Sequence, residues 1–152
     1  MAKTPRYQGS SRRAASQRLQ QPAGEQVDAK LVEQFKKALQ GTEEIQLTVT
    51  GRVSDRKISQ PVWFVQEDGI LYLLPVKGSD TEWFKNVLKN PTITLSAGRV
   101  GLSRKATPLT NPAKVRGVVE KFRGKYDTGD VSKYYSKFDV AVAVPLTPDA
   151  VI

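Results

Sequence analysis

Four basic residues lie in or beside turns that end predicted strands: Arg52, Arg56, Lys57 and Lys77. Gly78 and Ser79 follow the last of them and lead into a predicted helix. Free backbone N–H groups and the helix dipole attract negative charge to such a helix start. The pattern therefore predicts an anion site, although a solvated basic rim would explain the same charges without any ligand.

The sequence contains neither cysteine nor histidine. A disulfide framework, a thiol nucleophile and a Ser–His or Cys–His triad are therefore excluded. Zinc, copper and haem lose their commonest ligands, so we expect no metal site. No paired carboxylates stand out either. The remaining chemistry is that of tyrosine or a single carboxylate, or of a cofactor that brings its own reactivity.

The chain of 152 residues carries a net charge of +9, which suits anionic partners such as phosphorylated cofactors, nucleic acid or anionic lipid. Residues 1–26 are rich in Ser, Gln, Arg and Ala, and we expect them to form a disordered basic tail. Tyr7 is the one aromatic residue of this tail. Because single-strand binders interleave several aromatic residues with basic ones, we do not expect nucleic-acid binding.

Hydropathy gives no sign of a membrane protein. No run of about 18 apolar residues is present, so we expect no transmembrane segment. The N-terminus also lacks the apolar region of a secretory signal. Together with the absence of cysteine, these features predict a cytoplasmic protein.

Residues 27–152 are expected to form one domain with about four helices and six strands. Val27, Leu31, Phe35 and Leu39 recur every four residues and predict an amphipathic helix over residues 27–40. Two further helices are predicted over residues 112–124 and 130–138. Another helix is expected to open at a capping box formed by Ser79 and Glu82 and to end at Asn90-Pro91.

Alternating or continuous apolar patterns predict strands over residues 44–53, 59–66, 70–76, 92–96, 99–107 and 140–144. Pro61 indicates that the second of these lies at a sheet edge or carries a bulge. Most strands meet through hairpins, and Asp68-Gly69 is a strong hairpin turn. The strands therefore predict a mainly antiparallel sheet that forms a small closed or split barrel.

Three segments resemble the patterns of a known family. The first runs T-V-T-G-R-V-S from Thr48 and is followed by Pro61, the second is Lys77-Gly78, and the third runs W-F-K-N-V-L-K-N-P from Trp83. Residues 45–146 are thereby similar to the flavin and deazaflavin oxidoreductases that share the split β-barrel of pyridoxamine-phosphate oxidase. The most similar group is the deazaflavin-dependent nitroreductase branch. The resemblance implies an α+β, mainly antiparallel fold, with a six-stranded split β-barrel and flanking helices.

The resemblance also implies the site residues. The cofactor would be bound by Arg52, Ser54, Arg56, Lys57, Pro61, Val62, Lys77, Gly78, Ser79, Trp83 and Asn86. Its phosphate would lie near the basic loop and its tricyclic ring beside Pro61 and Val62. Tyr134 and Tyr135 would lie by the open face of the ring, where an acceptor can stack, and are the catalytic candidates.

The implied function is that of an oxidoreductase. A hydride would pass from a reduced deazaflavin coenzyme (F420 type), or from FMN, to a quinone, nitro-aromatic or related small-molecule acceptor. Such a reaction needs no protein nucleophile, which fits a chain without cysteine and histidine. Relatives with this barrel often dimerise with the cofactor near the interface, so the resemblance also predicts a homodimer.

The sequence departs from the family pattern at two positions. Asp55 stands where the family has glycine, and Ile58 stands where it has arginine. These departures favour one alternative, a non-catalytic split-barrel module that binds a flavin-like cofactor or a small hydrophobic ligand without turnover.

Overall fold

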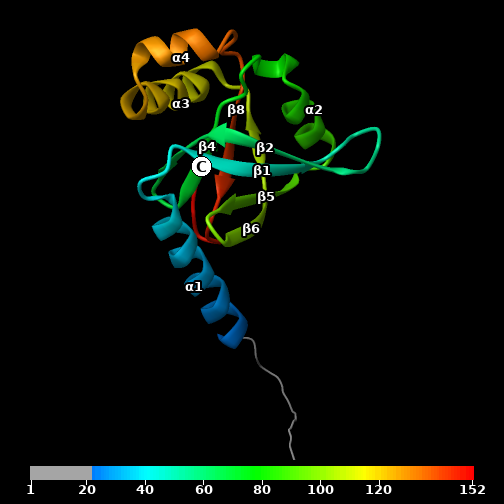
Figure 1. The fold of residues 1–152 in the computed structure, drawn as a ribbon, viewed down its shortest axis with the longest axis vertical. Coiled ribbons are helices and arrows are strands. Elements are labelled where there is room, and N and C mark those ends of the chain that lie inside the picture. Colours follow the sequence, from blue (N-terminus) through cyan, green and yellow to red (C-terminus); the bar gives the residue numbers. More distant parts are fainter. Residues whose placement is uncertain (1–21) are drawn as a thin grey trace, which may run out of the picture. The chain divides into compact units, whose positions relative to one another are not determined.

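The computed structural model describes residues 22–152, with side chains from Asp28 onward (Figure 1). Its first element is helix α1, Pro22–Leu39. Residue contacts divide the chain into two units between Gln34 and Phe35, within this helix. Helix α1 begins five residues before the predicted start at residue 27, with a proline at its first position, where its missing N–H costs nothing. The remainder of the predicted tail, residues 1–21, lies outside the described residues.

The second unit, Phe35–Ile152, holds two four-stranded sheets. The first sheet has the order β2-β1-β5-β6, formed by Lys57–Trp63, Glu44–Thr50, Thr92–Ala97 and Val100–Lys105. The second has the order β3-β4-β8-β7, formed by Val65–Glu67, Ile70–Leu73, Ala141–Pro145 and Thr107–Leu109. Every strand pair within these sheets is antiparallel, which confirms the predicted α+β, mainly antiparallel fold.

The structure has eight strands rather than the predicted six, because two predicted strands are each interrupted by one residue. Phe64 separates β2 from β3, and Ala106 separates β6 from β7. In both cases the chain leaves the edge of one sheet and continues at the edge of the other. Both residues are 2% exposed, so the breaks lie in the core. Two long strands therefore join the sheets into a split barrel.

The strand turns follow the sequence rules closely. Asp68 and Gly69 both have positive φ, 53° and 79°, and connect β3 to β4 where Glu67 pairs with Ile70. This is the two-residue hairpin expected from an Asp-Gly pair. Pro61 lies in β2, which is an edge of the first sheet, so its missing N–H leaves no gap in a central ladder.

Three helices and one short 3-10 turn flank the barrel. They are η1 (Gly78–Asp80), α2 (Glu82–Lys89), α3 (Pro112–Lys125) and α4 (Thr128–Tyr134). Asn111 caps α3, since its side chain accepts hydrogen bonds from the backbone N–H groups of Ala113 and Lys114. Helix α4 starts two residues before the predicted position and ends at Tyr134, which leaves Tyr135 in extended backbone.

The predicted capping box at Ser79 and Glu82 is wrong. Thr81 is the residue before the first turn of α2, and its hydroxyl accepts a hydrogen bond from the backbone N–H of Lys77 instead. Ser79 lies inside the preceding 3-10 turn, where its side chain bonds to Asp139. The sequence has the residue types of a capping box at these two positions. The Ser79 hydroxyl, however, donates its hydrogen bond to the distant Asp139 carboxylate.

Candidate functional site

A pocket of about 470 Å³ lies along the edge strand β2. Strand β2, the segment after β4, the start of α2 and the end of α4 provide its walls. Six of the predicted site residues line it together: Pro61, Val62, Lys77, Trp83, Tyr134 and Tyr135. A volume in this range and a mainly apolar lining are typical of small-molecule sites.

Other lining residues were not predicted as part of the site, above all Glu44 and Trp63. They are direct neighbours across the β1–β2 pair, where Glu44 opposes Trp63. Directly opposed residues in an antiparallel pair point to the same face of the sheet. The register of the hairpin, had it been worked out from the sequence, would have placed Glu44 beside any site that contains Trp63.

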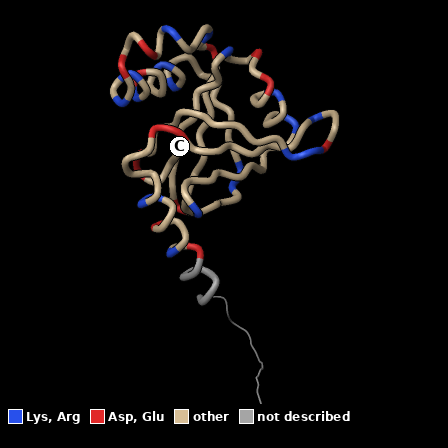
Figure 2. The backbone as a smooth tube through the Cα atoms, in the orientation of Figure 1, with Lys and Arg blue, Asp and Glu red and all other residues tan. Residues whose placement is uncertain are grey.

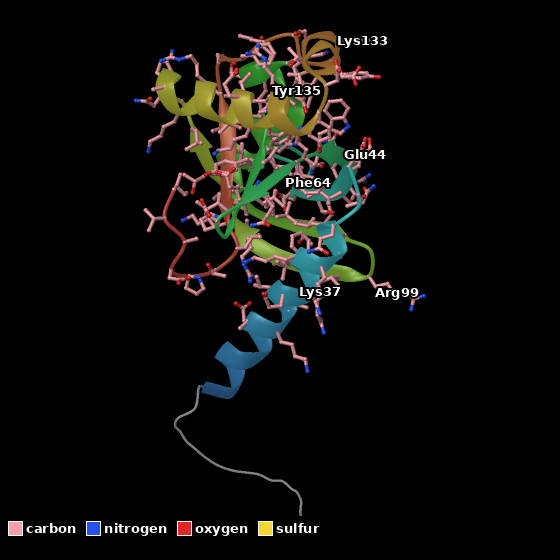
Figure 3. All side chains as sticks on the ribbon, turned by 90° about the vertical axis from the view of Figure 1, so that its left-hand side faces the viewer. Lys37, Glu44, Phe64, Arg99, Lys133 and Tyr135 are labelled. Atoms are coloured by element: carbon pink, nitrogen blue, oxygen red, sulfur yellow. The ribbon has the colours of Figure 1, made fainter. Side chains whose placement is uncertain are left out.

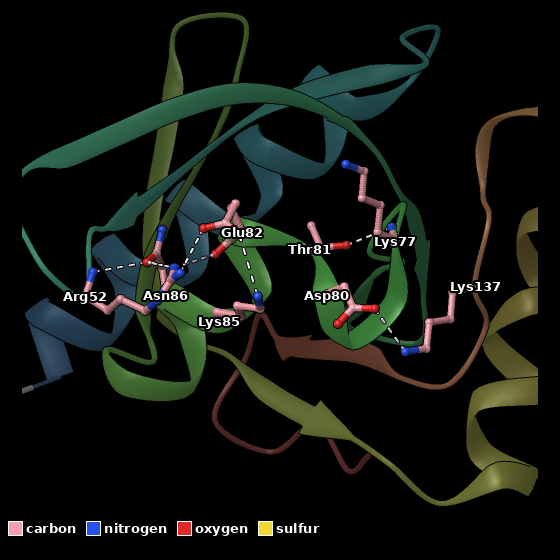
Figure 4. Close-up of polar contacts among 8 residues, drawn as sticks. All are labelled: Arg52, Lys77, Asp80, Thr81, Glu82, Lys85, Asn86 and Lys137. Atoms are coloured by element: carbon pink, nitrogen blue, oxygen red, sulfur yellow. Dashed lines mark hydrogen bonds and ion pairs between the residues drawn. The ribbon is translucent and has the colours of Figure 1, made fainter.

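Lys77 brings a cation to the pocket. Its backbone N–H donates to Thr81 Oγ1 at 2.8 Å, which fixes the start of the chain segment leading into α2. Its side chain is exposed and extends away from Thr81 (Figure 4). No hydrogen bond or ion pair of the Lys77 ammonium is found with any residue of the described chain. This charge is therefore available to an anionic ligand.

Gly78 and Ser79, also predicted to bind the cofactor, are in contact with the chain's own carboxylate at Asp139. The backbone N–H of Ser79 donates to Asp139 Oδ1 at 2.9 Å, and the Ser79 hydroxyl donates to Oδ2. Partial burial would raise the pKa of Asp139, but these hydrogen bonds and the charge of Lys137 together lower it. A cofactor phosphate could reach this N–H only by displacing Asp139.

Arg52 and Asn86 are bound to each other. Asn86 is 5% exposed, and its Oδ1 accepts from the backbone N–H of Arg52 at 3.0 Å and from Arg52 Nη1 at 2.8 Å. Arg52 Nη2 contacts Glu82 Oε1, also at 2.8 Å (Figure 4). The hydrogen bond and charge of Arg52 lower the pKa of Glu82. These contacts anchor the β1–β2 hairpin to α2, and only Glu82 among the three lines the pocket.

Ser54, Arg56 and Lys57 are exposed at the tip of the β1–β2 hairpin, where Figure 2 shows basic positions in blue. None of the three lines the pocket. Ser54 Oγ accepts from the backbone N–H of Arg56, and Lys57 Nζ donates to Thr50 Oγ1. Asp55 has φ 59°, in the left-handed region that favours glycine. The glycine of the family pattern therefore meets a backbone requirement, which aspartate also tolerates better than most residues.

Aromatic rings form the wall of the pocket beside α4. Trp63 stacks on Tyr126 with centroids 4.3 Å apart and planes 8° from parallel, and it meets Tyr134 at 5.3 Å and 76°. The two catalytic candidates differ in exposure, since Tyr134 is 54% exposed and Tyr135 is 5% exposed. Burial raises the pKa of the Tyr135 phenol, which makes it a poor source of a proton.

Behind this wall, Lys125 has an unusual environment. Its Nζ lies 3.3 Å from the ring centroid of Phe64 and donates to the Phe64 carbonyl at 2.8 Å. Phe64, labelled in Figure 3, is itself buried. Burial lowers the pKa of Lys125 to about 8, against a smaller opposite effect of the Glu43 carboxylate.

The lowered pKa predicts a pH dependence of stability. Between the folded pKa of about 8 and the ordinary value of 10.5, the unfolded state binds more protons at Lys125, so the free energy of unfolding should rise with pH. Tyr126, with a pKa raised to about 12 by burial, acts oppositely only above its ordinary value of 10.0. Urea unfolding from pH 8 to 10 should show the rise, and Lys125→Met should flatten it. Lys114→Met, an exposed change on the same helix, should keep it, and parallel curves for all three proteins would contradict the assignment.

Solved structures of other proteins share the fold of this chain. One similar solved structure is an F420-H2 dependent reductase (FDR-A), with 23% identity over 67% of this chain and 93% of that chain, and a TM-score of 0.54. A putative pyridoxamine 5'-phosphate oxidase from Listeria innocua has 14% identity over 75% and 91%, with a TM-score of 0.55. A third, described as a domain-swapped dimer, has 22% identity over 80% and 96%, also with a TM-score of 0.55. At these identities the likeness establishes the split-barrel fold.

The sequence establishes the family. Residues 16–145 match the family model of the F420H(2)-dependent quinone reductases, and the chain belongs to that family. It is thus a member of a family of deazaflavin-dependent oxidoreductases, as the resemblance of the three segments implied. No curated protein matches the chain.

Two further observations concern only residues 22–152. None of the helices there has both the length and the apolar character needed to cross a bilayer. No group of three or more acidic side chains in that part of the chain is arranged to hold a metal ion.

Proposed function

We propose that the protein uses a reduced deazaflavin coenzyme of the F420 type to reduce a quinone, nitro-aromatic or related small acceptor. The observation that carries the proposal is the pocket along β2, which joins apolar and aromatic walls to the unpaired ammonium of Lys77. Membership of the quinone reductase family supports the choice of coenzyme.

The residues of the pocket fit such a coenzyme. Its flat tricyclic ring requires an apolar slot, and Pro61, Val62 and Trp83 provide apolar surface on the pocket lining. Its phosphate-bearing side chain requires a cation, which Lys77 supplies at the segment leading into α2. When bound, the coenzyme supplies the hydride. The volume of about 470 Å³ lies within the range of sites for small molecules.

The protein's own contribution is position and exclusion of water. Lys77 would hold the anionic side chain, and the aromatic wall would orient the acceptor. Tyr134 is an exposed residue of this wall, and its hydroxyl would donate a hydrogen bond to an acceptor oxygen. Tyr135, whose raised pKa keeps it protonated, would act through packing rather than proton release.

Titration with the oxidised deazaflavin coenzyme tests the proposal directly. Both tryptophans of the chain, Trp63 and Trp83, line the pocket, so binding should quench the intrinsic fluorescence. Lys77→Ala should weaken binding by about 10- to 100-fold, because a charge-assisted contact to phosphate contributes roughly 1.5–3 kcal/mol. Lys105→Ala serves as the control, since Lys105 is an exposed lysine of β6 outside the pocket.

Equal affinity of the native protein and the Lys77→Ala variant would remove Lys77 from the site. Tighter binding of FMN than of the deazaflavin coenzyme would identify FMN as the coenzyme instead. Binding without reoxidation of the reduced coenzyme, across quinone and nitro-aromatic acceptors, would favour the alternative of a binding module without turnover.

A homodimer is part of the proposal. It is supported by the split-barrel relative that is described as a domain-swapped dimer. Light scattering combined with size exclusion would measure the mass, and a species at 16.8 kDa over the concentrations used for activity would exclude the dimer.

A further inference from the structure

We propose that the pocket prefers acceptors that carry a positive charge, such as a quinone with an alkylammonium substituent, and that the charge is held at a corner formed by Trp63, Tyr134 and Glu44. The proposal rests on the proposed function for the reaction, but the binding preference stands on the geometry of the corner alone.

Aromatic rings of the pocket lining form two sides of the proposed corner. Trp63 and Tyr134 both line the pocket and meet at 76° with centroids 5.3 Å apart, so they form two walls at nearly a right angle. Tyr126 covers one face of Trp63 in a stack 8° from parallel, which fixes the orientation of the indole. Tyr135 is a third ring on the lining, 6.0 Å from Trp63. Faces of such rings carry negative charge density and attract cations.

The carboxylate of Glu44 brings a negative charge to this corner. It lines the pocket and stands directly across the β1–β2 pair from Trp63, on the same face of the sheet. Within the described chain, no ion pair or hydrogen bond of this carboxylate is found.

Glu44 differs from the other acidic residues of the lining, because those residues form ion pairs within the protein. Asp80 is paired with Lys137 at 3.1 Å, and Glu82 with Arg52 at 2.8 Å. Their charges are therefore compensated by the protein. Glu44 is the acidic lining residue whose charge a ligand can meet, just as Lys77 is the cation free for an anion. The pocket thus offers each sign of charge at a different residue.

Ammonium groups of the protein itself lie near aromatic rings of this region. Lys133 Nζ lies 5.8 Å from the Tyr134 ring centroid, and Lys125 Nζ lies 3.3 Å from that of Phe64 and 5.1 Å from that of Tyr126. Neither lysine lines the pocket. Rings of this cluster therefore already attract cations, including Tyr134 on the pocket lining itself, whereas no ammonium is found over the Trp63 ring within the described residues.

The reaction balances for such an acceptor as it does for a neutral quinone. A hydride, which the bound coenzyme would supply, and the proton released as that coenzyme is oxidised would convert the quinone to a hydroquinone, and the ammonium substituent would be unchanged. The cation contributes binding and orientation only, with its charge held at the corner while the ring lies toward the coenzyme.

The test uses the protein without coenzyme and two probes of equal shape, 4-(trimethylammonio)phenol and 4-tert-butylphenol, which differ in charge. Calorimetry should show at least fivefold tighter binding of the cationic probe. Glu44→Gln should reduce this preference about threefold to tenfold and leave the neutral probe unaffected. Glu43→Gln is the matched control, because Glu43 is the adjacent exposed carboxylate and does not line the pocket.

Tyr134→Leu gives a second variant at an exposed position, and it should reduce the preference in the same direction. Equal affinity of the native protein for both probes would overturn the proposal, as would a preference that survives both substitutions together. If the oxidised coenzyme displaces the cationic probe, the coenzyme itself occupies the corner. That result would overturn the proposal that the corner binds the acceptor. Failure of the coenzyme titration with retained probe selectivity would count against the proposed function and not against this site.

Discussion

Replacing Gly78 by alanine is expected to lower the free energy of unfolding by about 2–4 kcal/mol. Gly78 has φ 55°, where an alanine loses about 1–2 kcal/mol relative to its preferred conformation. The new Cβ would also overlap Asp139 Oδ1 and lie 3.0 Å from Lys137 Cγ. The carboxylate must then move away from Ser79, and the loss of its two solvent-exposed hydrogen bonds adds roughly 1–2 kcal/mol in total. Chemical denaturation followed by circular dichroism measures the loss.

Two controls separate the causes of this loss. Gly117→Ala lies in α3 with no atom within 4 Å of the added Cβ, and it should be neutral or stabilising by roughly 0.5–1 kcal/mol. Asp139→Ala removes the group that the new Cβ would meet. If displacement of Asp139 causes most of the loss, the double variant Gly78→Ala/Asp139→Ala will be less destabilised than the sum of the single variants. Strict additivity would show that backbone strain alone is responsible.

Replacing Tyr126 by phenylalanine should cost about 2–3 kcal/mol, although it removes only one oxygen atom. The Tyr126 hydroxyl accepts from the backbone N–H of Phe64 at 3.1 Å and lies within 2.9 Å of two carbonyls, those of Phe64 and Glu43. Phe64 is the residue at which the chain passes from β2 to β3. Without the hydroxyl, a buried N–H at this break loses its partner, and such a group costs roughly 1–3 kcal/mol.

Tyr72→Phe is the matched control for this prediction. Tyr72 is half-buried in β4, and within the described residues no hydrogen bond of its hydroxyl is found, so the change should lie within about 0.5 kcal/mol. The Trp63 stack on the Tyr126 ring should persist in the Tyr126→Phe variant, so coenzyme affinity of the folded protein should stay unchanged. A loss of affinity without a loss of stability would contradict this division of roles.

The strands and hairpins could be predicted from the sequence because their signals are local. Ile45, Leu47 and Val49 alternate with polar residues and are all at most 3% exposed. The breaks at Phe64 and Ala106 carry no such signal. Both positions are apolar and continue an apolar or mixed strand pattern, and the passage between sheets depends on barrel closure, which involves the whole chain.

The candidate site could be predicted in part for the same reason. Pro61, Lys77 and Trp83 belong to the three matched segments, and they do line one pocket. The contacts of Arg52 and Gly78 could not be predicted, since their partners Asn86 and Asp139 lie 34 and about 60 positions away. A basic residue in a turn gives the same pattern whether it meets a ligand or the protein's own polar groups.

The edge position of β2 has a consequence for how the pocket recognises a ligand. Half of the backbone N–H and C=O groups of an edge strand point away from its neighbour. In β2 this unpaired side belongs to a strand that lines the pocket from Gln60 to Trp63. We therefore expect main-chain atoms of β2 to contribute to ligand binding, and no side-chain substitution would remove them. Pro61, which has no N–H, interrupts this row of donors and disfavours pairing with a further strand at that point.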